Sequence, residues 1–153
     1  MQLDFLLSMI RGALSLDQIF LSQTIIKTLN HHAIACLHFY AGQYRPCAVN
    51  VSNVNPPSHI QFPTLMDDHF VNSVNRYWNK LDAFLLSAYV LWRLNVIHPF
   101  INGHGRTARA CCYFVFCLRI GTLPKTKEIL PNLLIKGMVI LHYLKKSSPF
   151  KTI

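Results

Sequence analysis

Residues 81–120 read LDAFLLSAYVLWRLNVIHPFINGHGRTARACCYFVFCLRI, and this stretch decides the fold. Residues 81–97 are apolar on nearly every face of a helix, which is the pattern of a helix buried on all sides. Residues 105–120 repeat that pattern, and Pro99 and Gly121 end the two runs. The sequence therefore predicts two central buried helices joined by a short glycine-containing loop.

The rest of the chain adds helices on both sides of this centre. Helical spacing of apolar residues predicts them over residues 3–10, 17–41, 63–78 and 127–144. In the second of these, Asp17 serves as the N-cap and Gly42 as the stop. Prolines interrupt residues 44–62, where Val49 and Val51 alternate with polar residues. This segment is predicted to form a short β-hairpin or an extended flap followed by an irregular loop.

Composition and length indicate a single packed domain. A hydrophobic share of 52% against 14% charged residues supports a core. The most apolar stretch, residues 110–118, is closed by Arg109 and Arg119 and is too short to cross a membrane. The N-terminus does not resemble a signal peptide, because Asp4 stands where such a peptide is positively charged. The five cysteines lack CxxC spacing, which fits a reducing compartment. We expect one cytoplasmic all-α domain over residues 1–153, a helical bundle with a small β-hairpin flap before the central helices.

The charge of the chain favours an anionic partner. The net charge of +9 suits nucleic acid, a phosphorylated ligand or an acidic protein. The basic residues are scattered, however, with no dense run beyond Lys145 and Lys146. This distribution argues against a nucleic-acid-binding face.

The loop between the central helices combines the features of a phosphate site. Gly103 and Gly105 flank the point where the second helix begins, and the first backbone amides of a helix lack partners and carry a partial positive charge. Glycine lets an anion approach these amides closely. Arg106 and Arg109 stand three residues apart and so share one helix face. Together these features predict a site for a di- or triphosphate.

His98 stands on the other lip of this loop, and its ordinary pKa suits a general base near neutral pH. Each feature also has a plain structural explanation, because a histidine can cap a helix and paired arginines can form a solvated face. Their combination within twelve residues between two buried helices favours a functional site. A metal pair of His98 and His104 is an alternative, although the spacing matches no standard zinc motif.

These residues resemble the motif H-x-F-x-[DE]-G-N-G-R-x-x-R of the Fic/Doc family. The matching positions are His98, Phe100, Gly103, Gly105, Arg106 and Arg109. The order of segments before the motif is similar as well, over residues 42–45, 56–57 and 65–68. The resemblance covers residues 25–143 and implies the helical Fic fold.

The resemblance implies transfer of AMP from ATP to a serine, threonine or tyrosine hydroxyl of a target protein. His98 would accept the proton of that hydroxyl, and Phe100 would anchor the loop in the core. The nucleotide would lie against Asn102, Gly103, His104, Gly105, Arg106 and Arg109, with Mg²⁺ or Mn²⁺ as the metal cofactor. A flap of Val49, Asn50, Val51, Ser52 and Asn53 would pair with an extended segment of the target.

Two positions depart from the family motif, and both concern the nucleotide. Asn102 replaces the acidic residue that holds Mg²⁺, and a neutral amide oxygen is a poorer ligand for this cation. His104 replaces an asparagine whose amide orients the phosphates. We therefore expect a transferase with impaired activity, which Asn102→Asp together with His104→Asn would raise. The alternative is a catalytically inactive module that binds a nucleotide or a partner protein.

The inhibitory element of the family is missing from the sequence. Many members carry a helix with the pattern [ST]-x-x-x-E-[GN], whereas Glu128 is the only glutamate here and stands outside that pattern. The resemblance then leaves two possibilities. A separate antitoxin-like protein supplies the inhibitory glutamate, or no inhibitor is needed.

Overall fold

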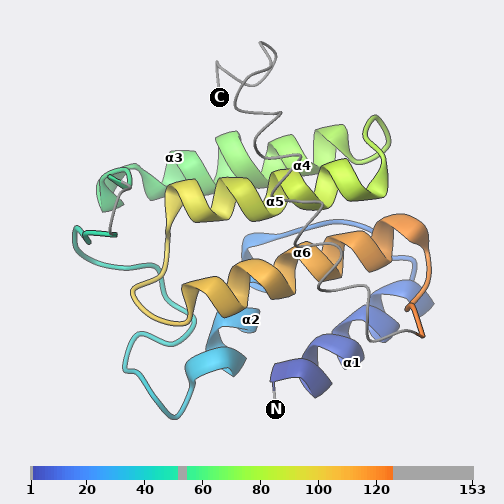
Figure 1. Cartoon of the computed structure of the whole chain (residues 1–153), viewed down its shortest axis with the longest axis horizontal. Helices are drawn as coiled ribbons and strands as arrows, with labels where there is room; N and C mark the ends of the chain where they lie inside the picture. The colour runs from blue at the N-terminus through green and yellow to red at the C-terminus, as the bar shows by residue number, and fades with distance from the viewer. Residues whose placement is uncertain (1, 52–54, 126–153) are drawn as a thin grey trace.

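The structure is a computed structural model of the chain and describes residues 2–51 and 55–125. Its elements are α1 (Gln2–Ser15), α2 (Gln23–Ile34), the 3₁₀ turn η1 (His59–Gln61), α3 (Phe62–Met66), the π-helical turn η2 (Asp67–Val71), α4 (Asn72–Tyr77), α5 (Ala83–Ile97) and α6 (His104–Ile120). Helices α5 and α6 lie side by side through the middle of the molecule (Figure 1). The α3–η2–α4 segment packs on α5, while α1 and α2 pack on α6 (Figure 1).

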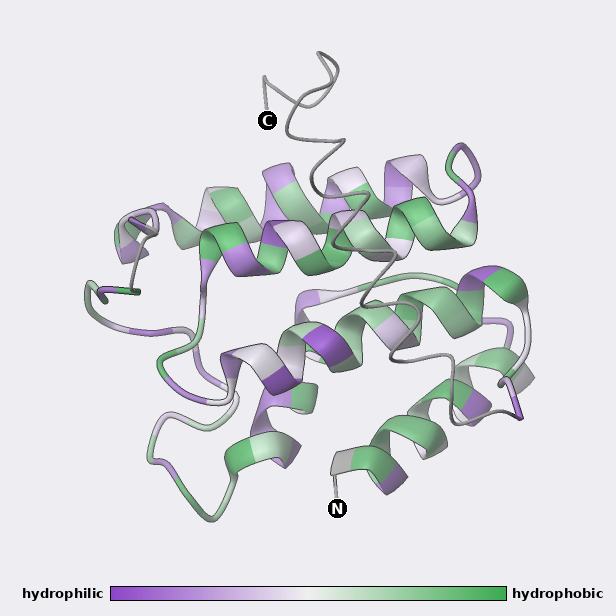
Figure 2. Ribbon diagram, in the orientation of Figure 1, coloured by the Kyte–Doolittle hydropathy of each residue, from purple (hydrophilic) through white to green (hydrophobic). Residues whose placement is uncertain are grey.

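The two central helices form most of the core, as the sequence predicts. Most residues of α5 and almost all of α6 beyond its first turns are buried. Figure 2 shows how the polar start of α6 gives way to an apolar remainder. Asp82 caps α5 by accepting the N–H groups of Phe84 and Leu85 at 2.9 and 3.0 Å. Within the described ranges, no helix has both the length and the apolar character that a bilayer span requires.

The first two helices begin and end at residues other than those predicted. Helix α1 continues to Ser15, beyond the predicted end at residue 10. The prediction of one helix over residues 17–41 is wrong, because α2 covers only Gln23–Ile34. The side chain of Asn75 accepts the N–H of Leu21 at 3.0 Å and donates to its carbonyl at 2.8 Å, which holds this segment out of a helix. Ser22, not Asp17, is the N-cap.

The segment predicted to form the flap is described only in part. Val49 and Asn50 lie in a loop, Val51 occupies an isolated bridge position, and Ser52 and Asn53 lie outside the described residues. The β-hairpin therefore stays a prediction. The helix predicted over residues 127–144 also lies outside the described residues, whereas the helix predicted over residues 63–78 is confirmed as α3, η2 and α4.

Asn30, in the middle of α2, connects the elements that surround the central loop. Its side chain is fully buried. The amide nitrogen donates to the Asn102 carbonyl at 3.0 Å and to Thr107 Oγ1 at 3.1 Å, and the amide oxygen accepts the Gly42 N–H at 2.9 Å. Thr107 in turn donates to the Gly103 carbonyl at 2.9 Å. One amide thus joins α2, the turn at residue 42, the central loop and α6.

Replacing this amide should destabilise the whole fold. Asn30→Ala removes three hydrogen bonds from a buried position, so we expect the free energy of unfolding to fall by about 3 kcal/mol in urea denaturation. Asn95→Ala is the matched control, because Asn95 is exposed and, among the described residues, its amide bonds to the Leu91 carbonyl of its own helix. Asn95→Ala should change the free energy of unfolding by less than about 0.5 kcal/mol. Equal effects of the two substitutions would contradict the connecting role of Asn30.

Candidate active site

The loop between α5 and α6 is bounded by two residues with positive φ. His98 ends α5 at φ 50°, where its N–H donates to the Leu94 carbonyl at 2.8 Å. Gly103 begins α6 at φ 67°, and a Cβ atom there would lie 2.6 Å from Ile34 Cγ2. Both the backbone conformation and this close approach require glycine at position 103. No described side chain caps the start of α6, so its first amides are available to a ligand.

Arg45 holds the other side of the loop. Its side chain is only 2% exposed, and it donates to three carbonyls: Nε to His98 at 2.8 Å, Nη1 to Cys47 at 2.8 Å and Nη2 to Pro57 at 2.7 Å. Its own N–H donates to the Pro99 carbonyl at 2.8 Å. Burial lowers the pKa of this guanidinium from its ordinary value. Arg45 therefore ties the ends of the predicted flap region to the backbone beside His98.

Two histidines stack against each other at the centre of the site. The rings of His98 and His104 have centroids 3.9 Å apart and an interplanar angle of 29°. Burial, His98 and Arg45 together lower the pKa of His104 to about 3. Burial and Arg45 also lower the pKa of His98. Both imidazoles are therefore neutral at pH 7, and a neutral His98 is the form that can accept a proton.

Both predicted arginines lie on the exposed side of α6. Arg106 Nη1 donates to the Ala33 carbonyl at the end of α2, at 2.9 Å. The guanidinium of Arg109 lies over Gly105, since a Cβ added to Gly105 would come within 3.3 Å of Arg109 Nη1. Each guanidinium has five N–H donors, so both keep donors for a phosphate. The structure thus brings these cations to the same helix start as the unpaired amides.

Asn102, the predicted metal ligand, lies at the exposed rim of the loop. Its Oδ1 accepts the N–H of Gly103 at 2.6 Å, and its backbone carbonyl accepts from Asn30. Among the described residues, no three His, Cys, Asp or Glu side chains gather closely enough to hold a metal ion. The alternative of a zinc site built on His98 and His104 therefore finds no third ligand of these types in the described part of the chain.

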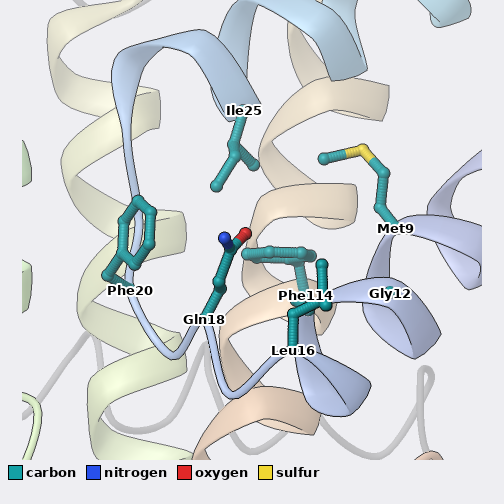
Figure 3. Close-up of a pocket in the computed structure, with 8 residues that line it drawn as sticks. Met9, Gly12, Leu16, Gln18, Phe20, Ile25 and Phe114 are labelled. Atoms are coloured by element: carbon teal, nitrogen blue, oxygen red, sulfur yellow. The ribbon is translucent and has the colours of Figure 1, made fainter.

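A separate cavity lies elsewhere in the fold. It measures about 270 Å³ and is formed by α1, the segment after it, α2 and α6. Figure 3 shows Gln18 and Phe114 facing this space, with Phe20 and Met9 nearby. Its lining is otherwise apolar and includes no residue of the central loop. The lining of this cavity therefore offers no cationic side chain to a phosphate.

Comparison with known proteins identifies the family. The family model described as Fic/DOC matches residues 20–116, more than half of the chain. The chain belongs to the Fic/DOC family. Among solved structures, it resembles a Fic-domain-containing signaling protein from Bacteroides thetaiotaomicron VPI-5482, with 26% identity and a TM-score of 0.67 over 92% of this chain. This Fic/DOC chain spans 54% of the length of that protein. No curated protein sequence matches it.

The structure places the predicted motif residues of this Fic/DOC chain, from His98 to Arg109, at the loop and at the start of α6. Two further residues, Asn30 and Arg45, contact the same loop. Phe100 is 1% exposed and anchors the loop beneath Tyr44, with ring centroids 5.6 Å apart. Asn30 and Arg45, which hold the loop, were not predicted as site residues. Asn30 had one detectable signal, since it is a polar residue within the apolar stripe of α2. Nothing in the spacing of the sequence indicated that the Arg45 side chain is buried.

The neutral state of His104 predicts a specific dependence of stability on pH. Below pH 6.5 the unfolded chain protonates this histidine, whereas the folded chain does so only near pH 3. The unfolded state then binds more protons, so the free energy of unfolding falls as the pH is lowered through this window. Between pH 6.5 and 5 the contribution is about 2 kcal/mol.

His104→Phe removes this titration but keeps a ring. We would measure the free energy of unfolding by urea denaturation at pH 6.5 and at pH 5, with EDTA present to remove any metal ion. It should fall less for His104→Phe than for the native chain between these two pH values. Parallel curves for the two proteins would contradict a neutral, buried His104.

Proposed function

We propose that this Fic/DOC chain is a protein adenylyltransferase, which moves AMP from ATP to a hydroxyl side chain of a target protein. The observation that carries the proposal is the position of His98. Its neutral imidazole stacks on the first residue of α6, beside amides that no described side chain caps. A base, a set of amide donors and two guanidiniums therefore meet at one loop, which suits attack of a hydroxyl on a phosphate.

The transfer exchanges one phosphorus–oxygen bond for another. The target oxygen would form a bond to the α-phosphorus of ATP, the bond from that phosphorus to the bridging oxygen would break, and pyrophosphate would leave. The hydroxyl proton would pass to a ring nitrogen of His98. The amides at the start of α6 and the guanidiniums of Arg106 and Arg109 would carry the negative charge of the phosphates. Such a reaction depends on placement and charge neutralisation, and not on covalent catalysis.

Asn102 fits a magnesium ion as a single neutral ligand. Asn102 is exposed, and its Oδ1 uses one lone pair for the Gly103 N–H, which leaves the second for a cation. Mg²⁺ is often held by one or two protein oxygens together with substrate phosphates and water. When bound with ATP, the ion would add positive charge at the phosphates. The missing carboxylate predicts weak retention of the ion and a slow enzyme.

The target protein would lie along the predicted flap. Arg45 contacts the carbonyls of Cys47 and Pro57 on either side of residues 49–53 and also that of His98. An extended target segment pairing with Val49–Val51 would therefore approach the base from a fixed direction. The net charge of +9 favours a target with acidic residues near the modified hydroxyl.

Asn102 also favours a second function, that of a nucleotide-binding module without catalysis. The Gly103 N–H already uses one lone pair of the amide oxygen, at 2.6 Å, and the amide brings no charge to a metal ion. A chain of this kind would bind ATP against α6 and transfer nothing.

A repair of the metal ligand distinguishes the two functions. With labelled ATP, limiting Mg²⁺ and cell lysate, we expect Asn102→Asp to raise the initial rate of protein labelling about tenfold, which corresponds to about 1.4 kcal/mol. Asn95→Asp is the control, because it adds the same charge at an exposed position on α5. His98→Ala should lower labelling at least about 100-fold in either background. If the Asn102→Asp protein binds ATP yet labels nothing, including itself, the chain is a binding module.

A further inference from the structure

The backbone of His98 is held firmly, but its ring is not held by hydrogen bonds. The N–H of His98 bonds to Leu94 and its carbonyl to Arg45, both at 2.8 Å. Within the described part of the chain, the ring nitrogens of His98 have no hydrogen-bond partner. A base must nevertheless be placed to within a fraction of an ångström of the proton it accepts. Among the described residues, stacking on His104 is a contact that restrains this ring.

His104 occupies its position without the hydrogen bonds that would explain a buried imidazole. Its side chain is only 7% exposed, and neither Nδ1 nor Nε2 has a partner among the described residues. An unpaired buried polar group costs about 1–3 kcal/mol. Such an exception calls for an explanation. The contact that His104 does make is through the face of its ring, which stacks on the ring of His98.

We propose that His104 is a positioning residue, whose ring serves as a platform that orients the imidazole of His98 for proton transfer. The inference rests on the proposed adenylyl transfer and deepens it. An asparagine at this position has no ring and cannot supply the platform. The two departures at the loop therefore act in opposite directions: Asn102 weakens the site, whereas His104 supports the base. Asn102→Asp alone should then give a faster enzyme than Asn102→Asp together with His104→Asn.

Three substitutions of His104 separate the ring face from the ring nitrogens. His104→Phe keeps a flat ring and removes both unpaired nitrogens, His104→Asn keeps an amide and removes the ring, and His104→Ala removes both. His32→Asn is the matched control, because His32 lies in α2 and its ring stacks on that of Phe5, with the ring centroids 3.5 Å apart. Urea denaturation confirms that each variant is folded before its activity is compared.

The kinetic result expected is a loss of kcat without a matching change in KM. In the Asn102→Asp background, His104→Asn and His104→Ala should lower kcat at least about tenfold while the KM for ATP stays within about threefold. His32→Asn should keep kcat within about threefold of the parent, whereas His104→Phe should recover most of the kcat that His104→Asn and His104→Ala lose. A His104→Asn protein as fast as its parent would overturn the proposal. So would a His104→Phe protein as slow as His104→Ala, since the ring nitrogens would then be the part that matters.

A second readout does not require any transfer activity. In NMR spectra of protein labelled at its eight histidines, the signals of the His98 ring are identified by their loss in His98→Ala. Because a stacked ring shifts the signals of its neighbour, His104→Asn should move the His98 ring signals and His104→Phe should leave them close to their native positions. Unchanged His98 signals in His104→Asn would overturn the platform.

The two readouts also separate this inference from the proposed function. If no variant labels a protein but the His98 signals move only when the ring is removed, adenylyl transfer fails and the platform stands as a structural contact. If labelling occurs and the signals never move, the platform fails and adenylyl transfer stands.

Discussion

The arrangement of this site depends on the buried amide of Asn30. One side chain satisfies the turn at Gly42, the carbonyl of Asn102 and the hydroxyl of Thr107, so α2 cannot shift without moving the central loop. Arg45 completes the restraint from the opposite side by holding the carbonyls of His98 and the flap region. Asn30 and Arg45 lie far in the sequence from the loop residues that they bind. The start of α6 is therefore presented to a ligand in one fixed geometry, which is what a preorganised phosphate site needs.

The fold could be predicted where local pattern and burial agree. Residues 81–120 are apolar almost throughout, and any compact solution places them at the centre as α5 and α6. The prediction failed for residues 17–41 because contacts distant in sequence override helical spacing there. Asn75 holds Leu21 outside a helix, and Asn30 holds the turn at Gly42. Neither partner can be recognised from the periodicity of the segment it restrains.

The site could be predicted as a set of residues but not as a geometry. The unpaired amides, the glycines and the arginines follow from consecutive positions at a helix start, and the structure gathers them there. The stacking of His98 on His104 does not follow from spacing, because it requires the chain to reverse through positive φ at His98 and Gly103. From the sequence, His104 is expected beside the phosphates, in the place of an asparagine that orients them. In the structure, its ring is buried against the ring of His98.

A crystal structure with a non-hydrolysable ATP analogue and Mg²⁺ tests most directly whether this loop is a preformed nucleotide site. The phosphates should lie within hydrogen-bond distance of the amides of residues 104–106, with Arg106 or Arg109 in contact. The bonds of Asn30 to Asn102 and of Arg45 to His98 should stay as they are in the free chain, because the loop needs no rearrangement. Phosphates bound elsewhere, or a loop that leaves Asn30 and Arg45 on binding, would contradict a preorganised site at the start of α6.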